Sequence, residues 1–158
     1  MRYATIVGIF IVMLTLVSGL VFAENVIDDS KNTGYLFVIS GTLGSLDGDT
    51  LTLNGVPNVI YFSDRPARIA GHMSVSKFVE MWDRWNNSFK EDPPNAVLSI
   101  LGENGTENIV VVLENLTVKG NDISIKIKKL QGTAPKEFKE SSLFIDLVEN
   151  GNGGWIGT

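Results

Sequence analysis

Cysteine is absent from the 158 residues of this chain. Disulfide bonds, a thiolate nucleophile and cysteine-ligated metal sites are therefore excluded. The length is that of one ordinary domain, which is large enough to enclose one hydrophobic core. We expect a single domain that is stabilised by this core and by hydrogen bonds.

Histidine is nearly absent as well, since His72 is the only one in the chain. Structural zinc takes four protein ligands, and with no cysteine to supply them we expect no metal. The phosphate-binding loop Gly-x-x-x-x-Gly-Lys-Ser/Thr, the nucleophile elbow Gly-x-Ser-x-Gly and the zinc motif His-Glu-x-x-His do not occur. We therefore expect no cofactor. Whether the chain is an enzyme stays open, and these absences favour a protein without catalytic activity.

Basic residues are too few for a nucleic-acid binder. The chain has 13 Lys and Arg against 18 Asp and Glu, which gives a net charge of −5. Proteins that bind nucleic acids without sequence preference carry an excess of basic charge. The small cluster of Lys126, Lys128 and Lys129 is expected to line the solvated side of a strand. The sequence therefore predicts no nucleic-acid partner.

The first 23 residues have the pattern of a secretory signal peptide. Arg2 is the only charge before Glu24, an apolar run follows it, and Val21 and Ala23 suit the positions before a cleavage site. The alternative is an uncleaved anchor, because the apolar run approaches the ~20 residues that span a bilayer. We expect a secreted, periplasmic or cell-surface protein, which meets a membrane only if this segment is retained.

The rest of the chain divides into three parts. Residues 24–33 are polar and are expected to form a flexible lead-in, and residues 34–149 are expected to form a single β-rich domain. Residues 150–158 form a glycine-rich tail. Either this tail is disordered, or Trp155 and Ile156 dock on a partner or extend the sheet edge of a neighbour.

The pattern of apolar residues in the domain predicts strands. Alternation with a period of two occurs at 50–54 and at 122–128, and Asp47-Gly48-Asp49 indicates a hairpin turn. The unbroken apolar run at 109–113 indicates a central strand covered on both faces. The expected strands are 35–43, 50–54, 58–62, 96–101, 108–113, 122–128 and 143–148. About seven strands with short turns predict an antiparallel barrel or sandwich.

One amphipathic helix is expected after the third of these strands. Its apolar stripe falls at helical spacing and consists of Val75, Phe78, Trp82 and Trp85. Ser74 or Ser76 can cap its start, and the proline pair at 93–94 prevents it from continuing. The stripe either packs against the sheet or presents its tryptophans to a carbohydrate or lipid. We favour packing, because tryptophan fills a core efficiently.

One stretch concentrates groups that can do chemistry. Asp64, Arg65, Arg68 and His72 lie between the third strand and the helix, on an expected loop. Two arginines suit a small anionic ligand, and His72 can carry a proton. The competing interpretation is a structural latch, in which these side chains satisfy the backbone groups of the crossover.

The motifs Tyr61-Phe-Ser-Asp-Arg-Pro-Ala-Arg-Ile-Ala-Gly-His-Met73 and Asp92-Pro-Pro-Asn-Ala96, together with Leu143-Phe-Ile-Asp146, resemble those of a family of small secreted microbial proteins. In that family the first motif appears as Tyr-Phe-Ser-Asp-Arg-Pro-x-Arg-x-Ala-Gly-His-Met, and a helix and the second motif follow it. The resemblance covers nearly the whole chain after the signal peptide, except the tail. It implies that the two motifs belong to one design, and it implies no activity.

Because these two motifs bracket the helix, we expect them to meet in space. The candidate binding cluster is Asp64, Arg65, Arg68, His72, Asp92 and Asn95. The leading hypothesis is an exported binding or structural domain that recognises a small anionic ligand through residues 64–72. One alternative is a small hydrolase or isomerase that uses His72 with Asp64 or Asp92. Another is a cell-surface assembly subunit.

Overall fold

The computed structural model describes residues 34–63, 65, 68–84, 89, 92–103 and 105–146. The expected signal peptide, the lead-in and the tail lie outside the described residues, and so do Asp64 and Trp85. The elements in chain order are β1 (Tyr35–Gly41), β2 (Leu43–Asp47), β3 (Thr50–Asn54), β4 (Val59–Ser63), β5 (Ala70–Met73), α1 (Val75–Arg84), β6 (Asn95–Gly102), β7 (Gly105–Lys119), β8 (Asp122–Gln131), β9 (Glu137–Phe138) and β10 (Ser141–Asp146).

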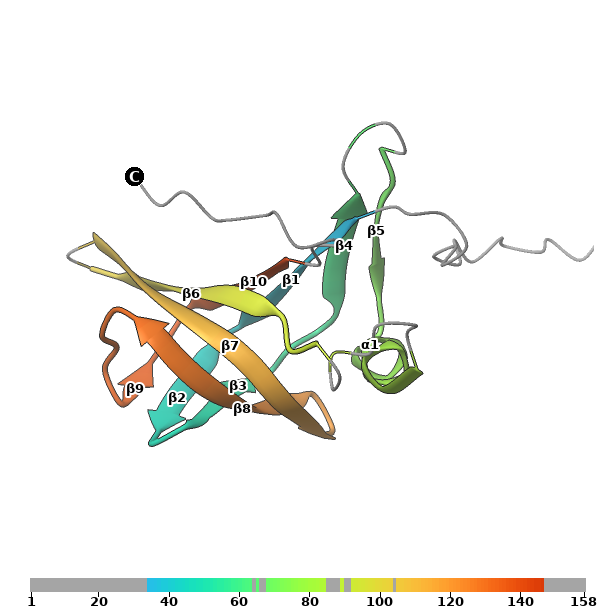
Figure 1. The fold of residues 1–158 in the computed structure, drawn as a ribbon. Coiled ribbons are helices and arrows are strands. Elements are labelled where there is room, and N and C mark those ends of the chain that lie inside the picture. The colour runs from blue at the N-terminus through green and yellow to red at the C-terminus, as the bar shows by residue number, and fades with distance from the viewer. Residues whose placement is uncertain are drawn as a thin grey trace, which may run out of the picture.

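The fold is mainly β, as the sequence predicts. One antiparallel sheet has the open strand order β5-β4-β1-β10-β6-β7-β8-β3-β2-β9, and a single short helix follows β5 (Figure 1). Within the described residues, no helix has the length and apolar character that crossing a membrane requires.

Within the part of the chain that the structure describes, the sheet has ten strands, more than the sequence predicts. The expected strand at 35–43 is divided at Thr42 into β1 and the start of β2, and β9 is only two residues long. Residues 70–73 form β5, where a loop was expected. The prediction that the helix follows the third strand is therefore wrong. Two strands that the sequence does not predict, β2 and β5, also precede the helix.

Alternation along the strands builds one core. In β1, β3, β4, β6, β8 and β10 every second residue is buried, and these side chains form a single hydrophobic cluster. β1 pairs with β10, while its continuation β2 pairs with β9, the short strand that precedes β10. The segment β1–β2 therefore runs beside the segment β9–β10. The sheet curls so that its buried side chains meet in one core.

The helix closes part of this core through its apolar stripe. The Ser74 hydroxyl oxygen accepts a hydrogen bond from the Lys77 backbone N–H at 3.2 Å, so Ser74 is the N-cap. Val75, Phe78 and Trp82 are buried, and Phe78 contacts Phe37 of β1 with ring centroids 5.3 Å apart. The packing prediction is confirmed for these three stripe residues.

The tryptophan-platform alternative does not hold for Trp82. Its side chain is 1% exposed, and its ring stacks on Phe89 with centroids 4.4 Å apart. A ligand-binding platform needs an exposed ring face, and this ring is covered by the protein itself.

Candidate functional site

The segment that contains the candidate residues forms a hairpin between β4 and β5. Ile60 pairs with His72 and Phe62 pairs with Ala70. At its tip, the Ser63 N–H donates to the Ile69 carbonyl, and the Ile69 N–H donates to the Ser63 hydroxyl, each at 2.8 Å. The prediction of a loop at 64–72 is therefore wrong for residues 70–72, and His72 belongs to a strand.

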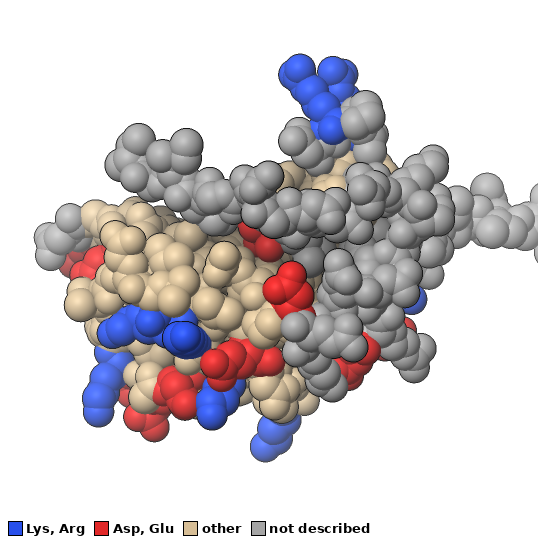
Figure 2. Space-filling model, in the orientation of Figure 1, with Lys and Arg blue, Asp and Glu red and all other residues tan. Residues whose placement is uncertain are grey.

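The two arginines of the candidate cluster lie at the tip of this hairpin. Both are exposed, and Figure 2 shows basic side chains gathered where the hairpin projects from the body of the protein. Arg68 has a backbone φ of 51°, the left-handed conformation that only glycine adopts freely. The tip therefore presents two guanidinium groups to solvent on a projecting turn.

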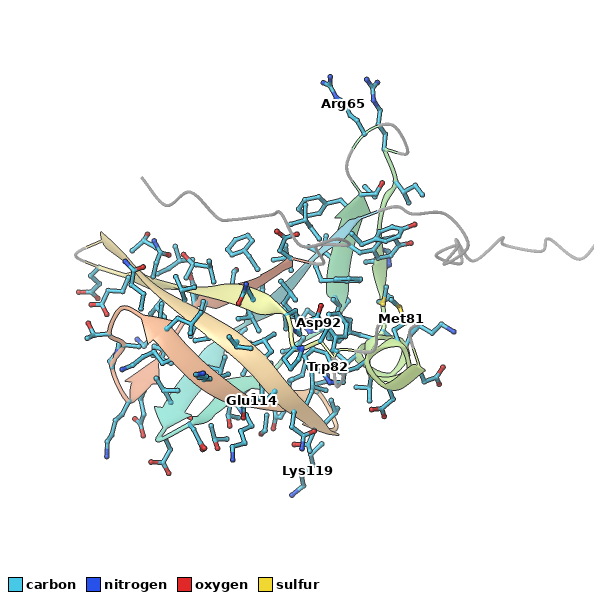
Figure 3. The ribbon with its side chains drawn as sticks, in the orientation of Figure 1. Arg65, Met81, Trp82, Asp92, Glu114 and Lys119 are labelled. Carbon is cyan, nitrogen blue, oxygen red and sulfur yellow. The ribbon has the colours of Figure 1, made fainter. Side chains whose placement is uncertain are left out.

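The structure does not bring the two motifs together at this tip. Figure 3 shows Arg65 at the end of the hairpin and Asp92 beside Trp82 and helix α1, near the opposite end. Asn95 begins β6 and pairs with Val112. The reason is β5, which runs back along β4 and carries the helix away from the tip. The role of each residue in ligand binding stays a prediction, and Asp64 lies outside the described residues.

A different feature dominates the outer side of the sheet. The register of the strands aligns outward-facing residues in two rows that cross β5, β4, β1 and β10, and the first row continues across β6 and β7. The first row is His72, Ile60, Val38, Phe144, Val97 and Val110. The second row is Ala70, Phe62, Leu36 and Asp146. The apolar residues of these two rows are here named the apolar outer face.

Large side chains in this face are open to solvent. Ile60 is 46% exposed, Phe62 38% and Phe144 37%, while Leu36 and Val38 between them are half-buried. Single exposed apolar residues are ordinary on protein surfaces, but a contiguous group across several strands marks an interaction site. A polar row borders it, in which the Ser40 and Ser142 hydroxyls lie 2.9 Å apart.

The other half of the same sheet has the polar exterior that antiparallel sheets usually show. On β3 and β8 the Thr52 and Ser124 hydroxyls lie 3.3 Å apart. Lys126 forms an ion pair with Asp49 at 3.3 Å. Figure 2 shows charged side chains gathered over the lower strands β7 and β8 and few over β6. Leu43 of β2, Val118 of β7 and Leu130 of β8 are also exposed in this half, but each is flanked in its strand by polar residues or glycine, so the exterior there is mostly polar.

Asp146 is the acidic residue of the second row. It pairs across the strands with Leu36 and is the last residue that the structure describes. Burial among its neighbours raises the pKa of this carboxyl above 3.8, because desolvation disfavours the charged form. A carboxyl with a raised pKa within an apolar surface can donate a hydrogen bond to a ligand when it is protonated.

The apolar outer face is not among the sites predicted above, although the sequence contains a signal for it. The run at 109–113 does not alternate, and it predicts a strand covered on both faces. In the structure Val110 and Val112 are half-buried on the outer side. An unbroken apolar run thus indicates a strand that is apolar on both sides. Only the register of the paired strands shows that the outward-facing apolar residues of different strands lie next to one another.

Across the described ranges, His, Asp and Glu residues form no group of three or more that could hold a metal ion. Comparisons of the chain with protein-family models, with curated proteins and with solved structures found no match.

Proposed function

We propose that this protein is a non-catalytic binding module that docks an amphiphilic, anionic partner. The apolar outer face receives the hydrophobic part of the partner, and the arginines at the hairpin tip, Arg65 and Arg68, receive its anionic group. The observation that carries this proposal is the exposure of Ile60 and Phe62 on β4 and of Phe144 on β10, with the half-buried Leu36 and Val38 of β1 between them. Burying such side chains is the main source of binding free energy in protein complexes.

The spacing of the titratable groups in the two rows argues against acid–base catalysis between His72 and Asp146. His72 lies on β5 and Asp146 on β10, with β4 and β1 between them. Three strand spacings of about 4.8 Å separate their backbones by roughly 14 Å. Acid–base catalysis needs groups within hydrogen-bond reach of the same proton or of one bridging water. These two groups are too far apart to act as such a pair.

The curl of the sheet supports a barrel-like body for this module. The segment β1–β2 is bordered on one side by β4 and β3 and on the other by β10 and β9. Curling lets one sheet cover its core without a second sheet. Such a body gives the apolar outer face a rigid support. The signal-like residues 1–23 favour a role outside the cytoplasm. The motifs at 61–73 and 92–96 agree with this role, because they resemble those of a family of secreted proteins.

Binding of a simple amphiphile tests the proposal. Decanoate carries an apolar chain and one carboxylate, and decyl maltoside carries the same chain without charge. We expect decanoate to bind the full chain more tightly, with NMR shifts at the methyl groups of Ile60 and Val38. Each methylene that is buried contributes about 0.8 kcal/mol, so the chain of either probe is long enough for detectable binding.

Two sets of variants locate the binding. Ile60→Ser with Phe144→Ser should weaken both probes about tenfold or more, since about 1.4 kcal/mol corresponds to tenfold. Arg65→Gln with Arg68→Gln should weaken decanoate alone. The matched control is Lys126→Gln on the polar half of the sheet. If the serine variants bind both probes as tightly as this control does, the proposed binding surface is wrong.

A further inference from the structure

The chain leaves the sheet within the apolar outer face. β10 lies between β1 and β6, and its outward residues Phe144 and Asp146 belong to the two rows that define this face. Residues 147–158 therefore start at the face itself, at Asp146.

The composition of this segment matches what the face can bind. It contains the large apolar residues Leu147, Val148, Trp155 and Ile156. Glu149 is its only charged side chain, and glycines at 151, 153 and 154 separate the two apolar pairs. The segment is thus apolar and acidic without any basic residue, which is the same chemistry as the proposed partner.

The reach of the segment is sufficient. Trp155 follows Asp146 by nine residues, and an extended chain spans about 3.3 Å per residue, so Trp155 can lie up to roughly 30 Å away. From β10, both β4 and β7 are two strand spacings distant, about 10 Å. Trp155 can therefore contact any apolar residue of the face. Because the segment is tethered beside the face, its effective concentration there is on the order of millimolar.

From these observations we infer that residues 147–158 fold back over the apolar outer face of their own chain, with Trp155 and Ile156 packed against Ile60, Phe62 and Phe144. The segment is a removable cover for the surface. The covering contact stands on its own, whereas the regulation that follows from it rests on the proposed function. A partner that binds this face must displace the segment, so the segment sets the threshold concentration at which the partner binds.

Disulfide mapping in the full chain tests the covering contact, and the absence of native cysteine makes the result unambiguous. Gly154→Cys places a thiol beside Trp155 without removing the anchor. It is combined with Ile60→Cys on the apolar outer face or, as the matched control, with Thr50→Cys on the polar half. We expect the Ile60 pair to close an intramolecular disulfide about tenfold faster than the control pair, because tethered docking raises the local thiol concentration.

Two results would overturn the inference. Equal rates for the two pairs would show that the segment has no preference for the face. A disulfide-linked dimer whose yield rises with protein concentration would show that the segment covers a second copy and not its own chain.

A second full-chain variant separates this inference from the proposed function. Trp155→Ser with Ile156→Ser should raise the affinity for decanoate several-fold, because the competitor is weakened. If the disulfide forms but neither decanoate nor decyl maltoside binds this variant, the proposed function fails and the cover stands. If the disulfide does not form and decanoate binding still depends on Ile60 and Phe144, the cover fails and the function stands.

Discussion

The ring of Tyr61 on β4 covers Gly71 on β5. The two residues are register partners, and a Cβ atom on Gly71 would lie 2.7 Å from the Tyr61 hydroxyl oxygen. The opposite end of the strand order repeats the arrangement, where Phe138 of β9 covers its partner Gly44 of β2. An aromatic ring over a cross-strand glycine fixes the register of short edge strands. Both outermost strands of the sheet, β5 and β9, are thus held in the same way.

Replacing Gly71 with alanine should destabilise the protein. The added methyl group cannot fit beside the Tyr61 ring, and overpacking of this kind costs about 1–3 kcal/mol in the free energy of unfolding. Urea denaturation measures the loss. In a Tyr61→Leu background the same substitution should cost much less, because the ring is gone. An equal cost in both backgrounds would show that the ring does not constrain Gly71.

The pH dependence of stability should contain a contribution from Asp146. Its pKa is raised in the folded protein, so the ionised carboxyl lowers stability at pH values above the folded pKa. This penalty is lost as the pH falls through the raised pKa toward the ordinary value of 3.8. Asp146→Asn should therefore increase the free energy of unfolding at neutral pH and not at pH 3.

Thermal unfolding as a function of pH checks this prediction. The difference between Asp146→Asn and the native chain should shrink as the pH is lowered, and the exposed Asp47→Asn variant serves as the control. A difference that does not change with pH would mean that the amide substitution acts through packing and not through charge.

The hairpin tip offers a substitution that distinguishes a latch from a binding site. Arg68→Gly should raise the free energy of unfolding by up to about 1 kcal/mol, because glycine adopts the left-handed φ of 51° without strain. The same variant should bind decanoate more weakly, since one guanidinium is lost. A stabilised variant with weaker binding supports a binding role for Arg68. A destabilised variant supports the latch.

Loss of the helix stripe should affect stability strongly. Phe78 is fully buried and contacts the rings of Phe37, Trp82 and Phe89. Phe78→Ala should cost about 3–5 kcal/mol in the free energy of unfolding. Lys77→Ala next to it removes only an exposed ion pair with Glu80 at 3.7 Å, which contributes less than about 1 kcal/mol. Comparable losses in the two variants would contradict the assignment of Phe78 to the core.

Local patterns predicted the regular elements well. The alternating runs at 50–54 and 122–128 are strands β3 and β8, and the Asp47-Gly48-Asp49 turn joins β2 to β3 with Gly48 at a φ of 59°. The stripe residues that the structure describes, Val75, Phe78 and Trp82, are buried. These features depend on periodicity and turn chemistry, which neighbouring residues determine.

Features that depend on pairing were not predictable in the same way. Ala70-Gly71-His72-Met73 has no clear strand pattern, and it is a strand because β4 pairs with it and Tyr61 covers its glycine. The candidate cluster joined Arg65 with Asp92 because both flank the helix, and it could not anticipate that β5 separates them. The apolar outer face arises from the register of strands that are distant in sequence.

The position of β10 has a consequence for how the protein is made. This last strand lies between β1, the first, and β6, so neither of those edges is paired until residues 141–146 have been synthesised. A shorter nascent chain exposes two unpaired strand edges and part of its core, which is a state that chaperones recognise and that tends to aggregate. The described sheet can therefore form as one unit only after residues 141–146 have joined it, so its folding is expected to follow the synthesis of residues 35–140 and not to accompany it.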